Sequence, residues 1–364
     1  MDKKLGFGCM RLPMNGDKVD YDEFNKMIDL YMENGFNYFD TAHGYIDGKS
    51  ETAIRDCLVS RYPRESYILT NKLTFSYFKS EEDIRPFFAL QLEKTGVEYF
   101  DYYLLHALND ERYVFYEECR AFDIAQELKQ EGKVKHVGIS FHDTADVLDK
   151  ILTEHPELEI VQIQFNYLDM ESPTVQSRKL YEVCRKHNKP MLIMEPVKGG
   201  ELANLPDEAK KVFDSFGEEY SYASYAIRFA ASFEGVYMVL SGMSNLEQMK
   251  DNLSYMKDFK PFSEEEYKAT EKVAEILLSL KGVACTGCRY CVAGCPMNIS
   301  IPDLFECYNL KKKFNSDTQE KYNLHTENGG RASECIECGQ CEGICPQKLS
   351  VISSLKDVVE IFEK

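Results

Sequence analysis

The chain has 364 residues, 44% of them hydrophobic, so it exceeds one average domain and can bury a sizeable core. Its 61 acidic and 43 basic residues give a formal net charge of −18, which disfavours nucleic acid and anionic membrane as partners because both need a basic face. No apolar run is long enough to span a membrane, and the first residues lack the apolar core of a signal peptide, so we expect a cytoplasmic protein with no membrane partner.

The chain up to residue 258 alternates short apolar segments with charged segments of helical period. Strands are expected to begin near Leu5, Phe36, Tyr67, Phe100, Lys135, Ile160, Met191 and Val236. Helices are expected between them, including residues 20–34, 81–94, 116–131 and 174–188. Short buried strands separated by helices predict βαβ units and a parallel sheet. Eight such units predict an α/β fold with a (β/α)8 TIM barrel over residues 1–258.

A doubly wound open sheet is the alternative to a closed barrel. Its usual dinucleotide fingerprint is G-x-G-x-x-G after the first strand, and residues 6–11 contain only the first two of its glycines. The sequence therefore favours the barrel.

Four polar residues stand where barrel strands are expected to end. Asp40 closes the second strand, and Tyr45 follows it five residues later. Lys72 closes the third strand and His106 closes the fourth. Each alone has an ordinary explanation, such as a helix N-cap for Asp40 or a core histidine for His106. Together they indicate an active site, because barrels place working residues at the carboxyl ends of their strands.

These four side chains are suited to moving a proton to or from an oxygen. A phenol has a pKa near ~10, and a neighbouring ammonium favours the phenolate and lowers that pKa. We predict that Lys72, held in place by Asp40, lowers the pKa of Tyr45. His106 would orient a carbonyl while Tyr45 protonates its oxygen. Because no side chain supplies hydride, such a site requires a cofactor.

The same residues carry a resemblance to a known family. The segments concerned are Gly6-Phe7-Gly8, Asp40-Thr41-Ala42-x2-Tyr45, Asn71-Lys72 and Leu105-His106. They resemble the aldo-keto reductase family, and the match runs from about residue 4 to residue 257. The resemblance implies a (β/α)8 barrel that uses NAD(P)H with a catalytic tetrad of Asp40, Tyr45, Lys72 and His106. With its cysteine-rich tail, the chain is similar to a bacterial subgroup of iron–sulfur aldo-keto reductases.

The resemblance also implies a coenzyme site. Its expected members are Gly8, Met10, Ser140, Gln164, Asn166, Pro196, Lys198, Gly199, Gly242, Ser244, Gln248 and Asn252. Many family members read the 2′-phosphate of NADP with Lys or Arg, where this chain has Gly242 and Gln248, so NADP(H) and NAD(H) both stay open. Lys198 is either a replacement phosphate contact, since barrel phosphate sites lie near loops seven and eight, or a solvated turn residue.

The chain changes character after residue 258. Residues 261–280 predict an amphipathic helix, with Ser263 as its N-cap and Gly282 past its end. We expect residues 259–282 to be a linker helix that leads to a separate domain over residues 283–364.

Eight of the chain's thirteen cysteines lie in this C-terminal part and follow two copies of C-x2-C-x2-C-x3-C-P. They are Cys285, Cys288, Cys291 and Cys295 in the first copy, and Cys335, Cys338, Cys341 and Cys345 in the second. This spacing is typical of bacterial ferredoxins with two [4Fe–4S] clusters, in which the fourth Cys of each run binds the other cluster. We predict that Cys345 completes cluster one, that Cys295 completes cluster two, and that the domain is small and α-helical.

Structural zinc and disulfides are the alternatives for these cysteines. Zinc favours two separated Cys pairs for each tetrahedral site, and disulfides favour a secreted chain, so both fit poorly. The remaining cysteines are expected to be buried packing residues, as free Cys usually is: Cys9, Cys57, Cys119, Cys184 and Cys307.

Three functions remain open from the sequence. The first is an NAD(P)-dependent oxidoreductase that acts on a small carbonyl or alcohol, with the clusters relaying electrons to an electron-transfer protein or stabilising the fold. The second is a flavin-mediated electron transferase, because barrels also bind flavin phosphate near loops seven and eight. The third is a non-catalytic redox sensor or carrier, which a complete tetrad disfavours.

Overall fold

The computed structural model describes residues 3–217, 220–280, 282–314, 316–327 and 329–364. The chain forms two compact units, Met1–Pro196 with Ala223–Ser263, and Val197–Tyr222 with Glu264–Lys364. The loop after the seventh barrel strand thus groups with the C-terminal part, and the boundaries at residues 258 and 282 stay predictions. Three residues on which predictions were made lie outside the described residues. They are Lys281, in the predicted linker helix, and Met1 and Asp2, in the segment where no signal peptide is expected.

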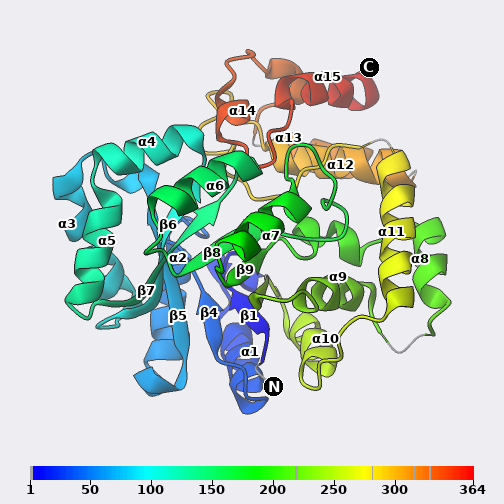
Figure 1. Cartoon of the computed structure of the whole chain (residues 1–364). Coiled ribbons are helices and arrows are strands. Elements are labelled where there is room, and N and C mark those ends of the chain that lie inside the picture. The colour runs from blue at the N-terminus through cyan, green and yellow to red at the C-terminus, as the bar shows by residue number, and fades with distance from the viewer. Residues whose placement is uncertain (1–2, 218–219, 281, 315, 328) are drawn as a thin grey trace. The chain divides into compact units, whose positions relative to one another are not determined.

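Eight parallel strands close into a barrel in the first unit, and the connecting helices lie outside the ring (Figure 1). The strands are β1 (Leu5–Gly8), β4 (Tyr38–Asp40), β5 (Ile68–Thr74), β6 (Phe100–Leu108), β7 (Val134–Phe141), β8 (Ile160–Gln164), β9 (Met191–Met194) and β10 (Val236–Ser241). The ring closes because β1 pairs with β4 on one side and with β10 on the other. The predicted TIM barrel is confirmed, each strand beginning within two residues of its predicted start, and the open sheet is excluded.

The helices of this part are α1 (Tyr21–Glu33), α2 (Lys49–Ile54), α3 (Glu81–Thr95), α4 (Asp110–Glu118), α5 (Ala121–Gln130), α6 (Ala145–Glu154), α7 (Ser177–Lys186), α9 (Tyr222–Ala231) and α10 (Leu246–Met256). Short turns of helix at Arg55–Val59, Arg64–Ser66 and Phe75–Tyr77, and a hairpin of β2 (Met14–Asn15) and β3 (Lys18–Val19), complete it. The single helix predicted at residues 116–131 is wrong. Arg120 has a left-handed backbone (φ 51°), which an α-helix cannot contain, so α4 ends before it and α5 begins after it.

Apolar side chains from several strands of the barrel pack together. One buried cluster there consists of Tyr38, Leu104, Ile160, Leu192, Met238 and Leu240. Gly138 lets β7 approach β8, because a Cβ at this position would lie 2.3 Å from the carbonyl oxygen of Ile160. The packed interior leaves the strand ends as the place where polar side chains can gather.

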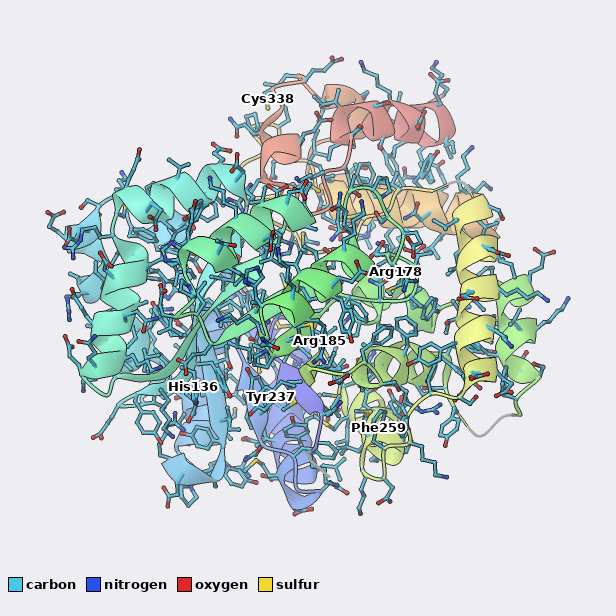
Figure 2. The ribbon with its side chains drawn as sticks, in the orientation of Figure 1. His136, Arg178, Arg185, Tyr237, Phe259 and Cys338 are labelled. Carbon is cyan, nitrogen blue, oxygen red and sulfur yellow. The ribbon has the colours of Figure 1, made fainter. Side chains whose placement is uncertain are left out.

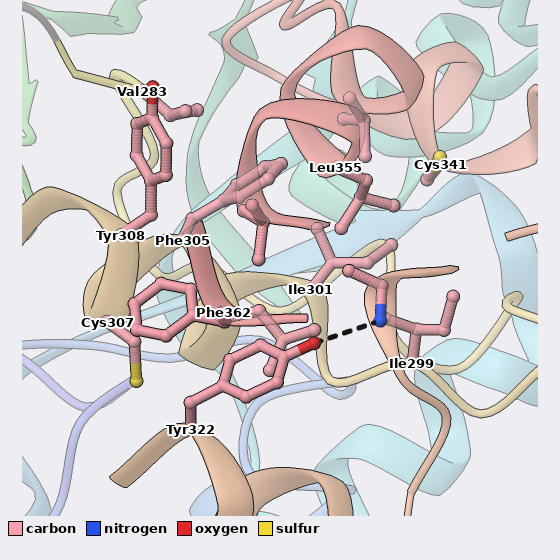
Figure 3. Close-up of a cluster of buried hydrophobic side chains, with 14 residues drawn as sticks. Val283, Ile299, Ile301, Phe305, Cys307, Tyr308, Tyr322, Cys341, Leu355 and Phe362 are labelled. Atoms are coloured by element: carbon pink, nitrogen blue, oxygen red, sulfur yellow. Dashed lines mark hydrogen bonds between the residues drawn. The ribbon is translucent and has the colours of Figure 1, made fainter. Parts of the chain in front are cut away.

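The second unit is mostly helical. It contains a 3-10 segment at Lys198–Ala203, α8 (Asp207–Asp214), α11 (Glu264–Ser279), α12 (Ile301–Phe314), α13 (Gln319–Glu327), a turn at Ala332–Glu334, α14 (Gln340–Ile344) and α15 (Val351–Phe362). Its core packs α12 against α15 around Ile301, Phe305 and Leu355 (Figure 3). The Tyr322 hydroxyl accepts a hydrogen bond from the backbone N–H of Ala332 at 3.3 Å. Partly buried cysteines, including Cys285 and Cys335, pack against this core.

Candidate active site and iron–sulfur centres

Lys72 occupies the centre of the candidate active site. It stands on β5, beside β4, whose last residue is Asp40. Its Nζ donates to Oδ1 of Asp40 at 2.6 Å and to the carbonyl oxygen of Thr41 at 2.9 Å. Lys72 is fully buried and Asp40 is 3% exposed, and a buried ammonium is tolerated only with such partners.

Tyr45 lies in the loop after β4, with its phenol oxygen 3.2 Å from Nζ of Lys72. The ring is half-buried and faces His106 edge-on, with 6.2 Å between ring centroids. The structure therefore brings Asp40, Tyr45, Lys72 and His106 together, as the sequence predicted. Tyr45 is more exposed than Asp40, Lys72 and His106, which are all buried.

The backbone that follows Tyr45 is strained. Ile46, Asp47 and Gly48 have φ values of 52°, 53° and 81°, and for a β-branched residue such as Ile46 this is an outlier that costs roughly 1–3 kcal/mol. The backbone N–H of Tyr45 donates to Ala42 at 3.0 Å, and its carbonyl accepts from Gly48 at 3.1 Å. Contacts around the loop must offset the strain for Tyr45 to keep its position.

The electrostatics of Tyr45 differ from the prediction. Burial, followed by the carboxylate of Asp40, raises the pKa of Tyr45 well above its ordinary value, so the predicted lowering by Lys72 is wrong for the chain alone. The main reason is burial of the phenol, and the carboxylate of Asp40, which is paired with Lys72 at 2.6 Å, adds to the rise. Burial also raises the pKa of Asp40, while Lys72 opposes this. At neutral pH Tyr45 is therefore a protonated phenol, the form that can donate a proton.

His106 is buried at the end of β6. Burial, followed by the positive charges of Lys72 and other neighbours, lowers its pKa well below the ordinary value, so the imidazole is neutral. Its Nδ1 lies 2.7 Å from the hydroxyl of Thr74. The next residue, Ala107, has a left-handed backbone (φ 59°), and its N–H donates to Oγ of Ser140 at 2.7 Å.

Three residues predicted for the coenzyme site are buried where β7 and β8 end. Ser140 supports the backbone after His106 through the hydrogen bond to Ala107. Asn166 donates to Oδ2 of Asp169 at 2.8 Å and accepts from two backbone N–H groups, so its amide is held by the protein. Gln164 is buried, and its carbonyl oxygen accepts from the hydroxyl of Ser177.

The predicted segment after β10 lies against the loop after β1. A Cβ at Gly8 would lie 3.4 Å from the carbonyl oxygen of Ser241, so the two backbones approach closely. Asn252 donates to Oγ of Ser241 at 2.8 Å, which fixes the end of β10. Gln248 accepts from the backbone N–H of Ser244 at 2.7 Å. Pro196, in the loop after β9, is buried, and Met10, in the loop after β1, is half-buried.

Two residues that the sequence reasoning did not select lie at this site. Gln162 donates a hydrogen bond to Oδ2 of Asp40 at 3.4 Å. It could have been selected from the sequence as a polar side chain within an apolar strand. Arg11 lies beside Gly242, because its Nη1 would be 3.8 Å from a Cβ there, and its carbonyl accepts from Oγ of Ser244. Arg11 was visible only as a cation shortly after the first strand, which is a weak signal.

Lys198 and Gly199 belong to the second unit. Both have left-handed backbones (φ 48° and 64°), and Lys198 is buried. A Cβ at Gly199 would lie 2.4 Å from the carbonyl oxygen of Thr286, so only glycine allows this approach to the first cysteine loop. The predicted phosphate loop therefore packs on the segment that begins the first cysteine motif.

Two cavities in the second unit are lined by the cysteine sets that the sequence predicted. One is lined by Cys285, Cys288, Cys291 and Cys345, and the other by Cys295, Cys335, Cys338 and Cys341. In both, the fourth cysteine comes from the opposite motif. Each cavity has about 340 Å³ of space not filled by atoms, including the solvent at its mouth. This donor set fits two [4Fe–4S] clusters with crossed ligands.

Burial and neighbouring thiols make the thiol of Cys291 less acidic. Burial, followed by the neighbouring thiols of Cys288, Cys285 and Cys345, raises the pKa of Cys291 to about 12. Loading a cluster has to deprotonate such a thiol, and the charge of iron supplies the driving force. Within the described residues, no group of three or more His, Cys, Asp or Glu is placed to hold one metal ion.

The cysteines differ in exposure. Cys338 is exposed, at the surface of the second unit, where Figure 2 labels it, whereas Cys341 is buried. The five cysteines outside the motifs are all buried, as expected for packing residues. Burial raises the pKa of Cys57 and Cys184 to about 12, so these thiols stay protonated.

The barrel fold and the C-terminal cysteine motifs agree with comparisons to known proteins. Residues 4–275 match the Aldo/keto reductase family, and residues 284–349 match the 4Fe-4S dicluster domain. The chain belongs to the aldo/keto reductase family and carries a C-terminal 4Fe-4S dicluster domain, which confirms the resemblance seen in the sequence. Among the described residues, no helix is long and apolar enough to cross a membrane.

Individual relatives share the barrel. The uncharacterized oxidoreductase YqkF of Bacillus subtilis is 24% identical over 296 residues, which are 74% of this chain and 91% of that protein. The NADH-specific methylglyoxal reductase of Escherichia coli is 27% identical over 185 residues, which are 46% of this chain and 54% of that protein. These relatives support an oxidoreductase.

Solved structures support the barrel fold. The holo form of an aldo-keto reductase from Bacillus halodurans has a TM-score of 0.60 at 24% identity, over 74% of this chain and 91% of that one. An aldo-keto reductase from Klebsiella pneumoniae in complex with NADPH has a TM-score of 0.61 at 18% identity, over 74% and 90%. Neither the matched families nor these relatives support flavin as a cofactor.

Proposed function

We propose that this protein reduces small carbonyl compounds, or oxidises the corresponding alcohols, with a nicotinamide coenzyme at Asp40, Tyr45, Lys72 and His106. The observation that carries the proposal is the contact between the phenol of Tyr45 and the ammonium of Lys72, 3.2 Å apart at the open end of the barrel. Membership of the aldo/keto reductase family supports it.

The proton is the part of the reaction that this chain supplies. In reduction, the carbonyl carbon gains hydride from the coenzyme, and its oxygen gains the proton of Tyr45, giving an alcohol and a phenolate. Lys72 lies close enough to stabilise that phenolate, and Asp40 keeps Lys72 charged and in place. Solvent then returns the proton to Tyr45.

His106 is proposed to orient the carbonyl. Its neutral imidazole can accept the Thr74 hydroxyl at Nδ1 and keep its own proton on Nε2. That N–H would donate to the carbonyl oxygen and leave the phenol of Tyr45 to complete the transfer.

The coenzyme is proposed to bind at the open end of the barrel near Gly8, Ser140 and Asn166, and along the segment of Gly242 and Ser244. Arg11, beside Gly242, would supply a positive charge to the phosphates. One relative is named as NADH-specific and one solved structure contains NADPH, so both coenzymes belong in the test.

Two [4Fe–4S] clusters are proposed for the second unit, bound by the crossed cysteine sets that line its cavities. Their chemistry is one-electron transfer, and an electron-transfer protein would be the outside partner. Cys338, a proposed ligand of the second cluster, is exposed, which would leave one edge of that cluster near the surface of this unit.

Anaerobic purification followed by analysis of one sample tests the proposal. We expect about eight irons and eight sulfides per chain, no flavin, and oxidation of NADH or NADPH with a panel of small aldehydes and ketones. Bound flavin without coenzyme-dependent turnover would contradict it and favour an electron transferase. Full clusters without turnover of any kind would favour a redox carrier.

A further inference from the structure

A buried polar cluster lies behind the candidate active site, between β5 and helices α2 and α3. Its members are His43, Glu51, Asn71 and Gln91. The hydroxyl of Tyr103 donates a hydrogen bond to Oε1 of Gln91 at 2.6 Å. Glu51, Asn71 and Gln91 are fully buried, and His43 is 8% exposed. A buried carboxylate is costly unless its oxygens accept hydrogen bonds. A buried cluster in which both oxygens of Glu51 are bonded therefore needs an explanation.

Glu51 uses its two oxygens in two directions. Oε2 lies 2.6 Å from Nδ1 of His43, two residues before Tyr45 in the same loop. Oε1 accepts from the amide of Asn71 at 2.8 Å, next to Lys72 on β5. One carboxylate thus joins the loop that carries the proposed proton donor to the strand that carries the ammonium.

The cluster holds the backbone of Lys72 on both sides. The N–H of Lys72 donates to Oδ1 of Asn71 at 2.8 Å, and its carbonyl accepts from Gln91 at 2.9 Å. Gln91 also donates to Oδ1 of Asn71 at 3.1 Å. Neighbouring residues of a strand point to opposite faces, so Asn71 reaches outward to the cluster while Lys72 reaches inward to Asp40.

His43 is also fixed by aromatic packing. Its ring stands edge-on to Tyr77 and Phe87, with centroids 4.6 Å and 5.1 Å away. These two rings are stacked on each other at 5.3 Å. His43 is therefore an anchored point only three residues before Ile46, where the strained backbone needs support.

We propose that Glu51 is a positioning residue, which sets the distance between Tyr45 and Lys72 by holding His43 on one side and Asn71 on the other. The proposal rests on the function proposed above. Glu51 touches neither substrate nor coenzyme. A displacement near 1 Å costs on the order of 10²-fold in rate, so loss of this link should slow the chemical step.

The test compares Glu51→Ala and Glu51→Gln with wild type in the full chain with intact clusters. Glu51→Ala is expected to lower kcat by roughly 10- to 100-fold, with KM for the carbonyl and Kd for the coenzyme changed less than about threefold. The primary deuterium isotope effect on kcat should rise, because hydride transfer becomes slower than product release. Glu51→Gln should recover most of kcat, since an amide can accept from Asn71 and donate to His43.

Asp101→Asn is the matched control, because Asp101 is another buried carboxylate with a short ion pair, at 2.6 Å to Arg64, and lies outside the proposed site. It should lower the unfolding midpoint while leaving kcat and the isotope effect unchanged. A Glu51→Ala enzyme that is destabilised in the same way but keeps its kcat within about threefold would overturn the positioning role.

Two further variants keep the test decisive. If Glu51→Ala does not fold, His43→Ala replaces it, and a normal kcat in His43→Ala would overturn the proposal. Tyr45→Phe, measured in parallel, separates the two levels of inference. If Tyr45→Phe retains turnover, the proposed function itself fails, whereas loss of turnover in Tyr45→Phe with full activity in Glu51→Ala and His43→Ala rejects only the positioning role.

Discussion

The ammonium of Lys72 lies 3.2 Å from the phenol oxygen of Tyr45, and both residues are part of an arrangement in which Asp40 already balances the charge of Lys72 at 2.6 Å. The pair is therefore not simply a cation next to a phenol. Because the pKa of Tyr45 is raised, its hydroxyl stays protonated over the physiological range. Lys72 becomes most useful after the proton has left, when a phenolate has to be stabilised.

Asp40→Asn should destabilise the folded chain strongly. It leaves the ammonium of Lys72 buried without a counter-charge, and breaking one side of a buried pair costs about 3–5 kcal/mol. Denaturant unfolding under anaerobic conditions measures this. Asp56→Asn, which removes the exposed partner of Arg55, is the control and should cost at most about 1 kcal/mol. Equal losses in the two variants would show that the buried pair is not special.

His106 should make the stability depend on pH in the acid range. Its folded pKa is lowered, so between that pKa and ~6.5 the unfolded chain binds more protons than the folded one. The contribution is fully present above pH ~6.5 and is lost as the pH falls below it. His106→Gln should therefore flatten the decline of the unfolding midpoint between pH 6.5 and pH 5. An unchanged decline would mean that the imidazole is not held neutral.

Crossed ligation of the clusters can be tested cysteine by cysteine. Cys345→Ala should remove cluster one and leave cluster two, although Cys345 belongs to the second motif, because it lines the cavity of Cys285, Cys288 and Cys291. Iron content should fall by about half, and the electron paramagnetic resonance signal of one reduced cluster should remain. Cys307→Ala, at a buried cysteine outside the motifs, should keep both clusters. A Cys345 variant that loses the same cluster as Cys335→Ala would contradict the crossing.

Ser140→Ala should disturb the site through His106. The hydroxyl of Ser140 accepts the N–H of Ala107, whose left-handed backbone follows His106 directly. Without it a buried N–H has no acceptor, which costs about 1–3 kcal/mol. We expect a lower unfolding midpoint and a higher KM for the carbonyl, measured by melting and steady-state kinetics. An effect confined to coenzyme affinity would instead show that Ser140 acts on the coenzyme alone.

Much of the fold could be predicted from the sequence, because the strands and helices follow from the local spacing of apolar residues. The strands from Leu5 to Val236 are apolar runs bounded by helices, and the two cysteine motifs have a fixed spacing. The break at Arg120 was missed, because no glycine or proline marks it and nothing local in residues 116–131 forbids one continuous helix.

Part of the candidate active site could also be predicted from the spacing of apolar residues. Asp40, Lys72 and His106 are polar side chains at the ends of apolar strands, which sequence periodicity can detect. The raised pKa of Tyr45 could not be predicted, because it depends on how deeply the phenol is enclosed and on its place beside the carboxylate of Asp40. Glu51 could not be found either, since on its own it is one more acidic residue at the start of a helix.

The central claim is that Tyr45 delivers the proton while the coenzyme delivers hydride. Single-turnover reduction of a carbonyl by coenzyme deuterated at the transferred position, in wild type and Tyr45→Phe, tests it most directly. We predict a loss of at least about 100-fold in the hydride-transfer rate, with coenzyme Kd and the spectra of both clusters unchanged. A Tyr45→Phe rate within about threefold of wild type would contradict the account.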